Sequence, residues 1–152
     1  MEELCFGLTP ANGIMTASSK RKFIMEIKEF DARQVSLLLS RHELKMMNNA
    51  LNEVCHGLRV VDFEAKMGSD KSETWPILKN IGRIYGEMKK SDNQDVEIGF
   101  SRRELRAIIG ALQEVCESLD AWEFPIRMGA ERSEVDQIMD EIVPTYHLMK
   151  LS

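Results

Sequence analysis

A cysteine followed directly by a histidine, at Cys55 and His56, has the residue types of a nucleophile and its general base. Adjacent side chains on a helix point about 100° apart, so these two cannot pair within one helical segment. A second, similar stretch of the chain has Glu117 in place of His56, and no oxyanion or base partner is recognisable. We therefore interpret Cys55 and its counterpart Cys116 as buried, unreactive thiols, and we predict no catalytic residue.

The spacing Glu53-x-x-His56 is also that of carboxylate-bridged di-iron sites in helix bundles, and Glu114-x-x-Glu117 repeats it. Such a site requires both pairs to point into the core, together with two further inward carboxylates. Because Val54 belongs to the apolar stripe of this segment, we expect Glu53 and His56 to face mostly solvent. The sequence favours a solvated charged face, so neither a metal site nor a cofactor is predicted.

The segment MGAERSEV at 128–135 has the spacing of a helix-turn-helix turn, and MGSDKSET at 67–74 repeats it. A helix that reads DNA approaches phosphates and needs Lys, Arg or neutral donors. The helix expected after the second turn carries Arg132 against five acidic residues, which are Glu131, Glu134, Asp136, Asp140 and Glu141. We expect the turn geometry without DNA reading, and a helix-turn-helix-like transcriptional regulator stays the alternative function.

The chain contains an internal repeat. Residues 39–85 and 100–146 align without a gap, and 18 of the 47 aligned positions are identical. Composition alone gives roughly three identities over this length, so the similarity indicates an internal duplication.

Each copy begins as a strand, at 35–39 and 96–100, with apolar side chains on one face. Ser40 with Glu43, and Ser101 with Glu104, have the spacing of a capping box that begins a helix. Each following helix carries an apolar stripe at the spacing of a buried face. The first stripe is Leu44, Met47, Leu51, Val54 and Leu58, and the second is Leu105, Ile108, Leu112, Val115 and Leu119.

A short segment then leads to Gly68 and to Gly129, which suit turns of positive φ. A last helix begins near Asp70 in the first copy and near Glu131 in the second. Pro144 is expected to kink or shorten the second of these helices.

The pattern predicts an α+β, mostly helical fold in which a strand–helix–short helix–helix unit occurs twice. One unit buries too little apolar surface to be stable alone, so we expect both to pack as one pseudo-twofold domain. Residues 22–30 are expected to form an N-terminal β-hairpin with 35–39, turning at 31–33. The division is 1–21 as an N-terminal extension, 22–94 as the first repeat and 95–152 as the second.

The 152 residues carry a net charge of −5 and a mean hydropathy of −0.28, and no window resembles a membrane helix. The segment 1–15 lacks the basic start and apolar run of a secretory signal. The three cysteines are odd in number and have no metal-type spacing, as in reduced thiols. We expect a soluble cytoplasmic protein for which a membrane or nucleic acid partner is disfavoured.

The two halves differ in charge. Residues 34–94 carry nine basic and eight acidic side chains, whereas 95–152 carry six basic and twelve acidic ones. Acidic residues of the first helical turn, such as Glu131, suit the helix dipole, but Asp136, Asp140 and Glu141 gain nothing from it.

From Glu131, Asp136, Asp140 and Glu141 we predict a surface that binds a basic protein partner, although a merely solvated face explains the same charges. A small acidic protein without catalytic groups has the character of a bacterial immunity or antitoxin-type protein. A structural homodimer is a further possibility.

Overall fold

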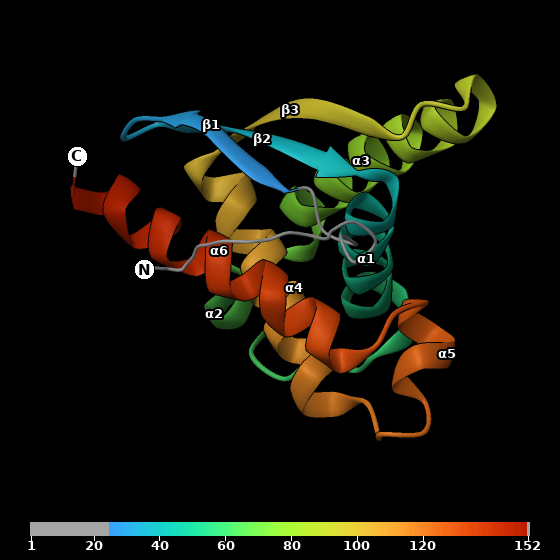
Figure 1. Cartoon of the computed structure of the whole chain (residues 1–152). Coiled ribbons are helices and arrows are strands. Elements are labelled where there is room, and N and C mark those ends of the chain that lie inside the picture. The colour runs from blue at the N-terminus through green and yellow to red at the C-terminus, as the bar shows by residue number, and fades with distance from the viewer. Residues whose placement is uncertain (1–24, 152) are drawn as a thin grey trace, which may run out of the picture.

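The computed structural model describes residues 25–151, and it is an α+β, mostly helical fold with a three-stranded antiparallel sheet (Figure 1). The predicted extension 1–21 and the first residues of the predicted hairpin lie outside the described residues. The strands are β1 (Glu26–Phe30), β2 (Gln34–Ser40) and β3 (Asp95–Ser101). The helices are α1 (Arg41–Asn52), the π-helical turn η2 (Glu53–Gly57), α2 (Phe63–Met67), α3 (Lys71–Ser91), α4 (Arg102–Ser118), α5 (Phe124–Met128) and α6 (Arg132–Leu151).

The sheet has β2 in the middle, with β1 and β3 antiparallel on either side. Alternate residues of β2 are fully buried, as predicted, and they are Val35, Leu37 and Leu39. In the ladder between β2 and β3, Leu37 pairs with Ile98, which is its counterpart in the repeat. Val35 pairs with Phe100, and Leu39 with Val96. The pairing is therefore symmetric about the central pair, and each strand presents its apolar face to the same layer of helices.

The predicted hairpin is confirmed for the described residues, because β1 pairs with β2. The turn between them is held by the Asp31 carboxylate, which accepts hydrogen bonds from the backbone N–H groups of Arg33 (2.8 Å) and Gln34 (3.0 Å). These hydrogen bonds lower the pKa of Asp31. Within the same segment, the side chains of Met25 and Ile27 are half-buried and pack against the core.

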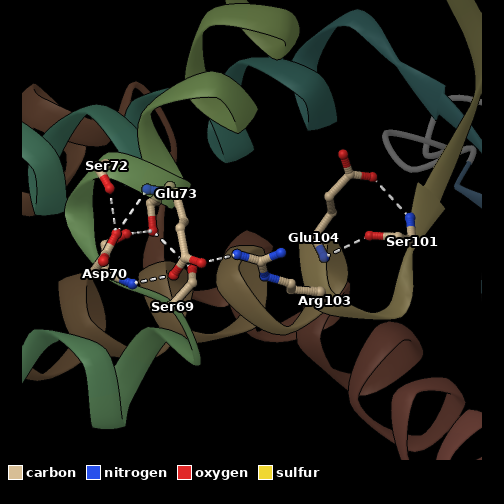
Figure 2. Close-up of polar contacts among 8 residues, drawn as sticks. Ser69, Asp70, Ser72, Glu73, Ser101, Arg103 and Glu104 are labelled. Carbon is tan, nitrogen blue, oxygen red and sulfur yellow. Dashed lines mark hydrogen bonds and ion pairs between the residues drawn. The ribbon is translucent and has the colours of Figure 1, made fainter.

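Three helices begin with capping boxes, as Figure 2 shows for α3 and α4. Ser40 and Glu43 cap α1, Ser101 and Glu104 cap α4, and Asp70 and Glu73 cap α3. The predicted stripes along α1 and α4 are buried, except that Leu58 is only partly covered. Capping and burial together fix where each helix begins and which face it turns to the core.

The helices form a layer under one face of the sheet, with α1 and α4 packed against each other (Figure 1). Outside this pair, α3 packs on α1 and α6 packs on α4. Residues from both halves of the chain contribute to one hydrophobic core. Consequently α3 and α6 flank the central pair, and each turns a long face to solvent.

Two details of the helices differ from the prediction. The first long helix ends in the π-helical turn η2, whereas its counterpart α4 stays α-helical to Ser118. Pro144 does not shorten the last helix, which continues through it to Leu151, and a kink at Pro144 stays a prediction. The predicted positive-φ turns are confirmed, with φ of 77° at Gly68 and 69° at Gly129.

The two short helices each pack on the long helix of the other half, α2 on α4 and α5 on α1. At the first crossing, the backbone of Gly110 lies so close to α2 that a Cβ there would be 2.3 Å from the Lys66 carbonyl oxygen. At the second crossing, the Asn49 side-chain amide donates to the Met128 carbonyl oxygen (2.8 Å). Within residues 25–151, no helix combines the length and the apolar character that a membrane span requires.

Candidate partner-binding surface

The carboxylate of Glu53 is buried, so the prediction that it faces solvent is wrong. Glu53 accepts a hydrogen bond from the Arg127 guanidinium, which reaches it from α5 of the other half. This contact is the largest cause of the raised pKa of Arg127. Glu114, the counterpart of Glu53, is also buried and pairs with Lys66 of α2 at 3.2 Å. A charged partner from a distant segment explains why these carboxylates lie inside.

A second reciprocal pair of contacts joins the halves near the starts of the helices. Glu134 of α6 lies 3.0 Å from the Nε2 atom of His42 in α1. The corresponding contact on the other side is between Glu73 of α3 and Arg103 of α4 (Figure 2). His42 and Arg103 occupy equivalent positions of the repeat, and so do Glu134 and Glu73. Glu134 is therefore committed to holding the halves together.

The side chains of Cys55 and His56 lie in different environments. Cys55 is buried, and burial raises the pKa of its thiol, as it does for Cys116. The exposed ring of His56 instead meets the Trp75 ring edge-on, with 4.9 Å between centroids. Within residues 25–151, no group of three or more His, Cys, Asp or Glu side chains is arranged to hold a metal ion.

Three of the four predicted partner-binding residues, Asp136, Asp140 and Glu141, lie on the solvent face of α6, and we call them the acidic arc. All three are exposed, and none of their carboxylates makes an ion pair with another described residue. Glu131 is exposed as well, but it precedes the helix, where its backbone N–H donates to Glu134 (2.8 Å). The acidic arc therefore lies entirely within α6, and Glu131 lies before the N-terminal end of that helix.

The corresponding positions of α3 have a different chemistry. Trp75, Lys79 and Asn80 stand where the acidic arc has its three carboxylates. All three are exposed, and α3 as a whole has five basic residues and two acidic ones. The outer helices of the two halves therefore present opposite charge to solvent.

An apolar patch that the sequence did not reveal lies on the turn before α5 and on α5 itself. Trp122 and Ile126 are exposed by 69% and 74% of their surface. Next to them is a groove of about 250 Å³, lined by Leu119, Ala121, Phe124, Pro125, Glu131 and Arg132. An isolated aromatic such as Trp122 is visible in the sequence, but the exposure of Ile126 follows only from the packing of α5.

Comparison of the chain with protein-family models, with curated proteins and with solved structures found no match.

Proposed function

We propose that this chain is a non-enzymatic, cytoplasmic protein–protein interaction domain that binds a basic protein through the acidic surface of its second half. The acidic arc carries the proposal: Asp136, Asp140 and Glu141 are exposed on one helix face and have no cationic partner among the described residues. A bacterial immunity or antitoxin-type protein, which neutralises a basic partner, is the specific version that we propose.

The contrast with other acidic residues supports this assignment. Glu53, Glu114 and Glu134 contact Arg127, Lys66 and His42 of the opposite half, and they belong to the architecture. The acidic arc contributes nothing comparable to the fold, and mutual repulsion along one helix face is mildly unfavourable. A basic partner would relieve that repulsion, and the complementary field would speed its encounter.

A non-enzymatic role agrees with the state of the nucleophile candidates. The thiols of Cys55 and Cys116 are buried, with raised pKa values, so little thiolate forms near neutral pH. His56 is engaged with the Trp75 ring rather than with a nucleophile.

We further propose that the two halves arose by tandem duplication of one strand–helix–short helix–helix unit and pack about a pseudo-twofold axis. Eighteen identities in 47 aligned positions support this proposal. It is also supported by contacts that recur at equivalent positions of the repeat, such as Glu53 with Arg127 and Glu114 with Lys66. In this account the duplication freed one copy to acquire the acidic surface.

The test is affinity capture from a lysate of the source organism, at low and moderate salt, with three forms of the tagged chain. These are the original chain, a variant with Asp136, Asp140 and Glu141 changed to Lys, and a control with Glu29, Glu64 and Asp95 changed to Lys. The control residues are exposed and make no ion pair among the described residues, so both variants change the charge equally.

We expect a basic protein that the original and the control capture and that the arc variant loses. Equal capture by all three forms, or loss with both variants, contradicts a specific acidic site.

A second candidate function is DNA binding, and the exposed face of α3 is the observation that favours it. This helix follows the short α2 and the Gly68 turn, and it presents Lys79 and Arg83 to solvent, although Arg83 is paired with Glu87. Fluorescence anisotropy with a random DNA duplex at low salt tests it. Binding that the double substitution Lys79→Glu and Arg83→Glu abolishes would favour this candidate over the acidic arc.

A further inference from the structure

We infer that Trp122 and Ile126 form the apolar anchor of the partner site and that the adjacent groove accepts a large apolar side chain from a basic segment of the partner. This inference rests on the proposed function, because it names the chemistry of the segment that the acidic second half binds. The segment of the partner that binds here combines Lys or Arg with apolar residues.

Local geometry puts the two anchor residues on one face. The turn before α5 is already helical in its hydrogen bonding, since the N–H groups of Phe124 and Arg127 donate to the carbonyl oxygens of Asp120 and Glu123 (3.0 and 2.9 Å). Trp122 and Ile126 are four residues apart in this run, so their side chains are neighbours on its outer face. Both are largely exposed, and an exposed Trp is typical of interface hot spots.

The groove lies beside this face. Its lining residues Ala121 and Pro125 each precede one of the anchor residues by one position, so the groove adjoins the anchor. Leu119 and Phe124 are buried and supply apolar lining, and Glu131 belongs to the wall contributed by the segment before α6. A volume of about 250 Å³ is large enough for one large apolar side chain.

The charge around the anchor determines the class of partner. Glu117, Asp120, Glu131 and Asp136 are exposed carboxylates of this end of the molecule, and none makes an ion pair with another described residue. Two cations not paired in this way face these four carboxylates: Arg132, which lines the groove, and Lys45, whose ammonium lies against Gly129 at the end of α5. Arg127 is held by Glu53 and Glu123. A basic segment is complementary to this surface, and an acidic one would be repelled.

The first half supplies an internal comparison. Its turn before α2 has Val61 where the second half has Trp122, and α2 has Ala65 in place of Ile126. Arg59 stands where the second half has Asp120. The large apolar pair and the acidic surroundings therefore occur together in the second half, whereas the equivalent positions of the first half have smaller apolar residues and Arg59.

The experiment uses the full chain with Trp75→Phe, so that Trp122 is the only tryptophan and its emission reports directly on the anchor. The probe is a synthetic peptide in which Lys and Leu alternate in blocks. One control peptide has Glu in place of Lys, and another has Ser in place of Leu. Each is titrated at low salt into the Trp75→Phe chain, and into the same chain with Ile126→Ser or, as the matched control, Val61→Ser.

We expect the Lys–Leu peptide to shift the Trp122 emission to shorter wavelength and to bind about tenfold more weakly after Ile126→Ser, but not after Val61→Ser. We expect the Glu–Leu peptide not to bind and the Lys–Ser peptide to bind at least about tenfold more weakly. An unchanged Trp122 emission with the Lys–Leu peptide, equal effects of both substitutions, or equal binding of all peptides would overturn the inference.

The result is separable from that of the capture experiment. If the arc variant loses its partner while the peptide leaves Trp122 unchanged, the anchor is wrong and the proposed function stands. If the peptide binds at Trp122 as expected while capture is insensitive to the arc, the anchor stands and the acidic arc is not the binding site.

Discussion

At the scale of single residues, buried carboxylates hold the two halves of this chain together. Glu53 and Glu114 are each nearly covered, and each is met by a cation from the short helix of the opposite half. A buried carboxylate without its cation keeps the full cost of its lost hydration. These ion pairs therefore link the short helix of each half to a buried carboxylate of the other half.

A double-mutant cycle tests this role of Glu53. We expect Arg127→Met alone to lower the free energy of unfolding by about 2 kcal/mol, because it leaves the Glu53 carboxylate buried and unpaired. Adding Glu53→Gln to that variant should recover at least about half of the loss, since the uncompensated charge is removed. Urea denaturation measures both.

Glu123→Gln is the control for this cycle, because it removes only the more exposed partner of Arg127. Its expected effect is below about 0.5 kcal/mol. A loss with Glu123→Gln as large as that with Arg127→Met would mean that Glu53 is not the partner that matters.

At the scale of elements, local signals in the sequence were sufficient for most helices and strands. The capping boxes beginning at Ser40 and Ser101 and the apolar stripes of α1 and α4 act within a few residues, so their spacing predicts them. The burial of Glu53 was not predictable in this way, because its cation lies 74 residues away. The π-helical turn η2 has no recognisable sequence signal either.

We expect two glycine substitutions to have opposite effects on stability, because α4 approaches α2 closely at Gly110 whereas Gly86 has free space around it. Gly110→Ala would put its Cβ 2.3 Å from the Lys66 carbonyl oxygen, so we expect a loss of about 3 kcal/mol as the helices are forced apart. Gly86 lies within α3, and a Cβ at this position would have no neighbouring atom within 4 Å. Gly86→Ala should therefore stabilise the protein by about 0.5–1 kcal/mol through helix propensity.

Thermal and urea unfolding of the two glycine variants measure these changes in stability. If Gly110→Ala is as stable as the original chain, the crossing of α2 over α4 is looser than described.

At the scale of the whole molecule, residues of both halves share one core, and contacts at equivalent positions of the repeat cross between them. We therefore predict that the chain unfolds in one cooperative transition. Trp75 lies in the first half and Trp122 in the second, so the variants Trp122→Phe and Trp75→Phe each report on one half.

The urea midpoints measured by the two single tryptophans should each agree with that measured by circular dichroism on the same variant. Two transitions within one variant, or a tryptophan transition that precedes the loss of helix, would show that the halves are independent domains.

The site was predictable only in part at this scale. The acidic residues of 131–141 and the charge difference between the halves are visible in the sequence, and Asp136, Asp140 and Glu141 do share an exposed face. The contact of Glu134 with His42 in a distant helix was not predictable from the sequence. Likewise, the groove beside Trp122 lies between residues 119–125 and residues 131–132, and the sequence pattern did not reveal how these two stretches pack.

Recognition of a basic protein by the acidic arc is tested most directly by the dissociation constant of the purified, captured partner, measured by isothermal titration calorimetry. We expect changing Asp136, Asp140 and Glu141 to Lys to weaken binding by at least about 100-fold, and added salt to weaken binding to the original chain. The control with Glu29, Glu64 and Asp95 changed to Lys should bind within about threefold of the original. A dissociation constant that neither the arc variant nor salt changes would contradict the claim.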